Sequence, residues 1–97
     1  MFTRIVKMKF KADKVAHFIS HFNSIKEKVR NQEGCQSVLL LQDQVDTTLF
    51  FTYSVWNDVA DLERYRKSEF FKGVWQETKQ LFDGKPEAWS VDKLVHL

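Results

Sequence analysis

The sequence predicts an α+β domain in which strands and helical regions follow one another in the order βαββαβ. Four segments have the alternating or continuous apolar pattern of strands, and two longer segments carry apolar residues at helical spacing. Capping and turn-forming residues separate these segments. With 97 residues, the chain corresponds to a single domain over 1–97.

The first strand is predicted over residues 2–11, where the side chains alternate between two faces. One face is apolar except for Arg4, and the other carries lysines together with Ile5. The apolar residues of the first face are Phe2, Val6, Met8 and Phe10. Arg4 is therefore a charge on an apolar face, where it must be paired or must face a wet cavity.

The first helix is predicted over about 13–30, because apolar residues recur there on one stripe. They are Val15, Phe18, Ile19, Phe22, Ile25 and Val29. Gly34 has the signature of a C-cap that ends this helix. His17 and His21 have the i, i+4 spacing of some metal ligands, but no third ligand is evident nearby, so no metal site is predicted.

A hairpin follows, with strands over 35–42 and 49–56. The polar loop between them, residues 43–48, is short enough for a direct connection. Cys35, at the start of the first of these strands, is expected to be a small buried thiol, because no neighbouring base marks it as a nucleophile.

The second helical region is predicted over 58–82. Asp58 is the expected N-cap, and Asp61 completes a pair that resembles a capping box. Ser68 is expected to break the region and to cap a second helical segment.

Residues 83–86, with the sequence Asp-Gly-Lys-Pro, predict a turn, and the last strand is predicted over 87–95. Its apolar residues on one face are Trp89, Val91 and Val95. The complete order is the split βαβ, or ferredoxin-like, pattern, in which both helical regions cover one face of a four-stranded antiparallel sheet.

The strands of the central hairpin are apolar on both faces. The strand over 49–56 carries Leu49, Phe51, Tyr53 and Val55 on one side and Phe50 and Trp56 on the other. The strand over 35–42 carries Leu39 and Leu41 on one side and Val38 and Leu40 on the other. Two apolar faces imply that both are covered, but the helices can cover only one. The second face most simply packs on another copy of the sheet, which predicts an isologous homodimer through the sheets.

Composition and charge exclude several classes of function. A net charge of +2, with 15 basic and 13 acidic residues, gives no argument for nucleic acid or for an anionic membrane. RNA-recognition modules share the element order, but their basic, glycine-containing strand motif is missing here. A single cysteine fits a reducing cytoplasm, and neither a signal peptide nor a membrane-spanning run of about 18 apolar residues is evident.

Aromatic residues make up 14% of the chain, and they either enlarge a small core or line a pocket. Trp56 ends a strand, where it either closes the core or forms a stacking platform whose indole N–H bonds a substrate. Tyr65 carries a phenol that can pass a proton. Phe71 and Trp75 continue the same helical stripe and would form the roof of such a pocket.

Polar residues near these aromatics are further candidates for substrate binding. Thr52 and Tyr53 lie on opposite faces of one strand, and the sequence does not fix which face meets the pocket. Arg64 and Arg66 flank Tyr65, where they either form an exposed helix face or stabilise an anionic substrate.

The chain resembles the antibiotic biosynthesis monooxygenase family of dimeric α+β barrels. The matching segments are RIVKMKFKA, NQEGCQSVLLLQD and YSVWNDVADLERYRKSEFFKGV. The resemblance implies a substrate cavity between sheet and helices, in which some members oxidise quinols or polycyclic phenols with molecular oxygen and no cofactor. It further implies that Trp56 forms a wall and a hydrogen bond, that Tyr65 relays a proton, and that Phe71 and Trp75 roof the cavity.

Two departures from the family pattern bear on this expectation. Trp75 occupies the position of the iron-ligating histidine of the haem-degrading branch, and with no histidine expected nearby, haem is disfavoured. Relatives that oxidise polyketides tend to have Asn where this chain has Thr52.

The leading hypothesis is a cofactor-independent monooxygenase of a small aromatic or quinol-type substrate, with molecular oxygen as co-substrate. A non-catalytic ligand-binding module and an isomerase of a small metabolite are the alternatives on the same fold. The isomerase needs a charged pocket, so the directions of Arg4 and Arg64 discriminate that case.

Overall fold

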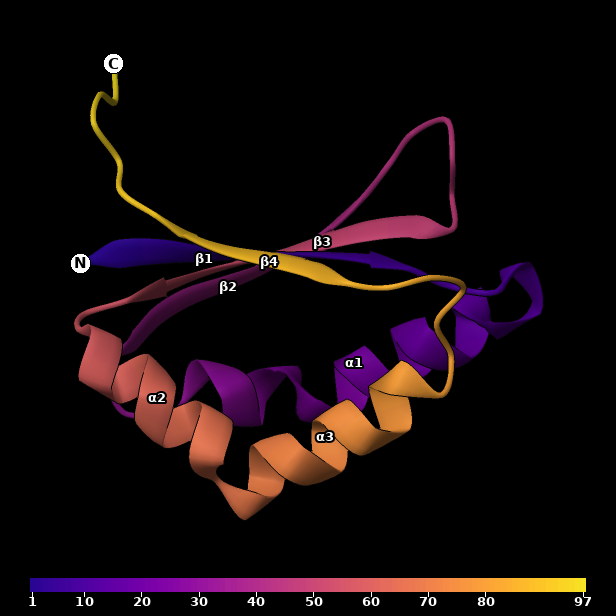
Figure 1. Ribbon diagram of the computed structural model, residues 1–97, viewed down its shortest axis with the longest axis horizontal. Coiled ribbons are helices and arrows are strands. Elements are labelled where there is room, and N and C mark those ends of the chain that lie inside the picture. The colour runs from indigo at the N-terminus through magenta and orange to yellow at the C-terminus, as the bar shows by residue number, and fades with distance from the viewer.

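A four-stranded antiparallel sheet forms one layer of the structure, and the helices form a second layer on one of its faces (Figure 1). The computed structural model describes residues 1–97. The strands are β1 (Phe2–Lys9), β2 (Cys35–Gln42), β3 (Leu49–Trp56) and β4 (Glu87–Val91), in the spatial order β2-β3-β1-β4. The helices are α1 (Val15–Arg30), α2 (Val59–Lys67) and α3 (Glu69–Lys79), with a short 3₁₀ helix (Ala12–Lys14) before α1. This is the predicted α+β, ferredoxin-like fold.

The second helical region divides where the sequence predicts. The Asp58 side chain accepts a hydrogen bond from the Ala60 N–H and begins α2, and Ser68 Oγ accepts one from the Phe71 N–H and begins α3. Both predicted N-caps are confirmed. At the resulting bend the chain changes direction, so that α2 runs away from the sheet and α3 runs back toward it (Figure 1).

The end of α1 differs from the prediction. The helix ends at Arg30, and the Asn31 N–H caps it by bonding the Glu27 carbonyl. Gly34 lies beyond the cap, in the turn before β2, with φ of +83°, and a Cβ atom there would collide with Asp61. Glycine is therefore required by this turn rather than by the helix end.

The first and last strands of the chain are shorter than predicted. β1 ends at Lys9, and Phe10 forms only an isolated bridge with Phe82. β4 ends at Val91, so residues 92–97 leave the sheet and run past its edge (Figure 1). None of the helices has the length and hydropathy required to cross a bilayer.

The strand register decides which side chains meet the helices. Arg4 of β1 lies opposite Ser54 of β3, and Val6 lies opposite Thr52. These residues share the face that α1, α2 and α3 cover. The other face stays uncovered and carries apolar side chains at the surface, namely Leu39, Leu41, Tyr53, Trp89 and Val91.

The buried core consists of two separate clusters between sheet and helices. The larger contains Met8, Phe10, Phe18, Phe50 and Leu81, and the smaller contains Cys35, Trp56 and Leu62. Members of both clusters line a cavity between them. The fold thus holds a hollow where a fully packed domain would have one continuous core.

Candidate functional site

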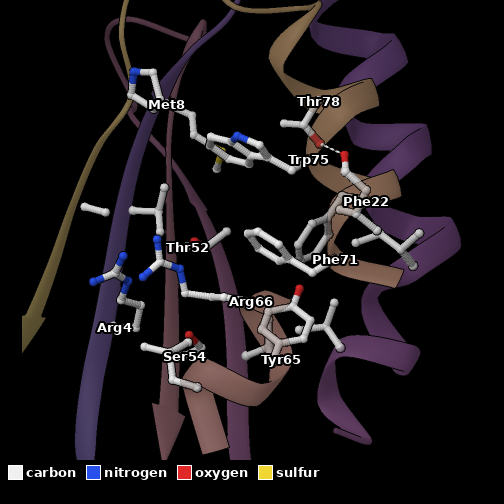
Figure 2. A pocket seen from close by; sticks show the side chains of 18 of the residues that line it. Arg4, Met8, Phe22, Thr52, Ser54, Tyr65, Arg66, Phe71, Trp75 and Thr78 are labelled. Carbon is white, nitrogen blue, oxygen red and sulfur yellow. Dashed lines mark hydrogen bonds between the residues drawn. The ribbon is translucent and has the colours of Figure 1, made fainter. Parts of the chain in front are cut away.

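The cavity has a volume of about 280 Å³ and lies between the sheet and all three helices (Figure 2). Fourteen of its 22 lining residues are hydrophobic, which suits a small, largely apolar ligand. Six of the seven side chains that the sequence predicts for the site line it, and these are Arg4, Thr52, Trp56, Tyr65, Phe71 and Trp75.

An aromatic wall, formed by Trp56, Tyr65, Phe71 and Trp75, runs along the cavity. The Trp56 and Tyr65 rings are stacked with centroids 5.3 Å apart, and the Tyr65 and Phe71 rings meet edge to face at 5.0 Å. Phe71 and Trp75 are nearly parallel at 6.1 Å. The cap at Ser68 creates this continuity, because it turns the start of α3 so that Phe71 meets Tyr65 of α2.

Trp56 combines two roles that the sequence leaves as alternatives. Its side chain is only 1% exposed and packs with Cys35 and Leu62, as a core residue does. It also lines the cavity. Its indole Nε1–H donates to Ser54 Oγ at 2.9 Å, so this N–H is already used within the protein and is not free for a substrate.

Tyr65 presents its hydroxyl to the cavity (Figure 2). The Tyr65 hydroxyl bonds no protein group. Since every fully buried side-chain oxygen and nitrogen atom of the protein has a hydrogen-bond partner, this hydroxyl is not fully buried and opens on the cavity. Burial, and to a smaller extent the nearby Cys35, raise the pKa of Tyr65. The phenol therefore stays neutral at physiological pH.

The alternation of β3 separates Thr52 from Tyr53. Thr52 lines the cavity on the same face as Ser54 and Trp56. Tyr53 points to the opposite face, where it is 38% exposed, and it does not line the cavity. Because a strand alternates with a period of two, Tyr53 cannot share the cavity with Trp56, three residues on.

The arginines divide between cavity and surface. Arg4 lines the cavity, and its Nη1 donates to Ser90 Oγ at 3.1 Å. Burial, followed by the charge of Arg66, lowers the pKa of Arg4, while Glu63 opposes this. Arg64 points outward instead, to the carboxylates of Glu33 and Asp61.

Arg66 also lines the cavity, although the sequence left open whether it lies on an exposed helix face or meets a substrate. The signal for it was present, because Arg66 follows Leu62 by four residues on α2, and Leu62 is buried in the smaller core cluster. Residues at i and i+4 share a helix face, so the side chain of Arg66 passes over the cavity.

His21 corrects the expectation that no histidine lies near the cavity, because it is part of the lining. Its Nε2 lies 3.2 Å from Thr78 Oγ1, whose own proton goes to the Val74 carbonyl at 2.7 Å. Nε2 must therefore donate, and Nδ1 lies 3.3 Å from a carboxylate oxygen of Glu77. Both ring nitrogens are engaged, and Trp75 offers no ligand, so these residues do not fit a haem iron.

The His17 ring contacts the other carboxylate oxygen of Glu77 at 3.4 Å, so Glu77 of α3 lies between two histidines of α1. Even so, no group of three or more His, Cys, Asp or Glu side chains has an arrangement that could hold a metal ion. The Cys35 thiol is buried, as expected, and burial raises its pKa.

Solved structures of other proteins share this fold. A conserved protein from Methanosarcina mazei superposes with a TM-score of 0.88 at 23% identity, over 96% of this chain and 93% of that one. A crystal structure described as an antibiotic biosynthesis monooxygenase has a TM-score of 0.90 at 20% identity, over 98% of this chain and 100% of the other. A protein from Pseudomonas aeruginosa has a TM-score of 0.85 at 22% identity, over 97% and 94%.

No curated protein matches the sequence. The model of one protein family does match it, over residues 1–76, which include β1 to β3, α2 and most of α3. The matched region thus contains the strand that ends on Trp56 and most of the cavity lining. The chain belongs to the antibiotic biosynthesis monooxygenase family.

Proposed function

We propose that the protein is a monooxygenase that oxidises a small aromatic or quinol-type substrate with molecular oxygen inside this cavity. The observation that carries the proposal is the Tyr65 hydroxyl, which is free of protein partners and opens on an apolar cavity beside an aromatic wall. Membership of the family supports the reaction class.

The proposed chemistry needs no cofactor. A deprotonated phenol passes one electron to molecular oxygen. The resulting phenoxyl radical and superoxide then combine at the ring carbon para to the phenol oxygen. For a substrate of the anthrone type, whose CH₂ group at that carbon becomes CH when the anion forms, the peroxide takes up a proton, loses water and leaves a carbonyl, so one atom of O₂ enters the product and the other enters water. The protein binds the ring, favours the anion and excludes water.

Tyr65 is the proposed proton relay between substrate and solvent. Its raised pKa excludes a resting phenolate, so it does not act as a strong base. A neutral phenol can still accept a proton on its oxygen while it releases its own. Trp56, Phe71 and Trp75 hold the ring of the substrate, and Thr52 is a candidate on the sheet for a further hydrogen bond.

Oxygen uptake with a panel of hydroquinones and anthrones tests the proposal. The wild type is expected to consume oxygen, and Tyr65→Phe is expected to lower the rate by roughly 10²-fold or more, the contribution of a positioned proton-transfer group. Tyr53→Phe is the matched control, since it removes the only other phenol of the chain from the opposite face. Absence of uptake in the wild type, or equal rates in the two variants, would contradict the proposal.

A binding module without chemistry is the second candidate, and the largely hydrophobic lining favours it. Trp56 is consistent with this candidate, because its N–H is satisfied by Ser54 and needs no substrate. Thermal stabilisation by apolar aromatics, without oxygen uptake for any substrate of the panel, would support it over the monooxygenase.

Two further expectations accompany the proposed activity. The uncovered apolar face of the sheet supports a homodimer in which two sheets pack on each other. A reducing cytoplasm is the proposed location, because the single cysteine is free and buried.

A further inference from the structure

Two guanidinium groups converge on one side of the cavity. Arg4 extends from β1, next to the edge strand β4, and Arg66 extends from the last turn of α2 toward it (Figure 2). The two side chains are close enough for the charge of Arg66 to lower the pKa of Arg4. Sheet and helix layer thus each contribute one positive charge to the same cavity.

The protein supplies one carboxylate to these two charges, because Glu63 pairs with Arg66 and also opposes the lowering of the Arg4 pKa. The Arg4 guanidinium bonds the neutral hydroxyl of Ser90, and Arg66 reaches Glu63 only at 3.5 Å on the exposed surface. Glu87 is the one acidic residue of the cavity lining, and it faces Lys7 at 3.9 Å. One carboxylate compensates these two like charges only in part, and a bound anion would relieve the repulsion that remains.

The charges and the aromatic wall occupy parts of the cavity with different access to water. The side chain of Arg66 is 46% exposed, so the arginine pair lies where the cavity meets solvent. Trp56 and Leu62, which also line the cavity, are buried. A ligand that matches this gradient has an apolar ring system inside and an anionic group at the mouth.

We propose that the ligand of this cavity is an aromatic acid, with its carboxylate between Arg4 and Arg66 and its ring against the aromatic wall. Guanidinium groups suit this role because they present paired N–H donors to the two oxygens of a carboxylate. The inference deepens the proposed function, and it rests on that function only for the statement that the bound acid is oxidised.

Calorimetric titration with two redox-inert ligands tests the anion site. The ligands are 2-naphthoate and its neutral methyl ester. The wild type is expected to bind the acid roughly tenfold or more tightly than the ester, the usual effect of a hydrogen-bonded charge pair. Arg66→Gln is expected to remove this preference while leaving the affinity for the ester unchanged, because the aromatic wall stays intact.

Arg64→Gln is the matched control. It removes the same charge two residues earlier on α2, where the guanidinium points to Glu33 and Asp61 and away from the cavity. This variant should keep the preference for the acid, which separates a local contact from a change in net charge. Both arginines are exposed, so neither variant is expected to prevent folding.

Equal affinity of the wild type for acid and ester would overturn the inference, as would a preference that persists in Arg66→Gln, or binding of neither ligand. Oxygen uptake is read separately with hydroquinones. A preference for the acid without any oxygen uptake would support the anion site and contradict the proposed oxidation. Oxygen uptake without a preference for the acid would support the oxidation and contradict the anion site.

Discussion

The contact between Ser54 and Trp56 shows how single residues of β3 shape the cavity. The two side chains lie on the same face of the strand, and the indole N–H donates to the hydroxyl at 2.9 Å. The bond fixes the indole ring that stacks on Tyr65. A loss of activity in Trp56→Ala would therefore reflect loss of folded protein. Truncating a buried Trp costs about 3–5 kcal/mol, and the total stability of a domain is about 5–15 kcal/mol.

Ser54→Ala is expected to lower the free energy of unfolding by about 1–3 kcal/mol, because it leaves a buried N–H without an acceptor. In a Trp56→Phe background the same substitution should cost little, since no N–H remains to be satisfied. Urea denaturation of the two single variants and the double variant measures the coupling, which we expect to be about 1–3 kcal/mol. Additive effects would show that the hydrogen bond does not contribute to stability.

Residues of the site could be predicted from the sequence where chemistry and position agree. Trp56 and Tyr65 stand at a strand end and on a helix stripe, and both line the cavity. Tyr53 was assigned by its chemistry, and the strand register then placed it on the other face. For Arg66 the sequence left open an exposed helix face or a contact with an anionic substrate, and its long side chain reaches the cavity from a partly exposed position.

Among the elements, the loop of the β2–β3 hairpin is held by one carboxylate. Asp46 accepts hydrogen bonds from the Thr48 N–H and hydroxyl and from Lys9 Nζ of the neighbouring β1. These bonds favour the charged form, and they lower the pKa of Asp46 from 3.8 to about 2, with the Thr48 side chain as the largest cause.

Asp46→Asn is expected to destabilise the protein in a pH-dependent way. Because the pKa is lower in the folded state, the charged carboxylate stabilises the fold fully above pH 3.8, and this contribution is lost as the pH falls through about 2. The difference in unfolding free energy between wild type and variant should therefore be constant from neutral pH to about 4 and should shrink below it. Denaturant titrations at several pH values measure this, and a difference that persists unchanged at pH 2 would contradict the assignment.

The bounds of the strands and helices could be predicted where capping or turn-forming residues mark their ends. β2 and β3 have the predicted bounds, because Gly34, the polar loop and Asp58 mark their ends. No such signal ends β4, so the apolar residues near the C-terminus extended the prediction by four residues beyond Val91. A strand needs a partner as well as a pattern, and β1 offers β4 partners only from Thr3 to Lys7.

At the scale of the whole molecule, one broad face of the sheet has no cover. Leu39 is 53% exposed, and Leu41, Tyr53, Trp89 and Val91 are each more than a third exposed on the same face. The molecule measures 36 × 35 × 21 Å, so this face can supply the roughly 800 Å² per partner of a standard interface. A 97-residue domain also gains more than a large one from such burial, because it buries a smaller fraction of its own surface.

Leu39→Arg is expected to convert the proposed homodimer into monomers. In an isologous interface each substitution occurs twice, so two charges would enter the apolar contact without partners. Light scattering coupled to size exclusion at micromolar concentration should give twice the chain mass of 11.5 kDa for the wild type and the single mass for the variant. Val59→Arg is the control, because Val59 is 61% exposed at the start of α2, on the helix layer. A monomeric wild type, or equal dissociation by both variants, would show that the apolar face of the sheet is not the dimer interface.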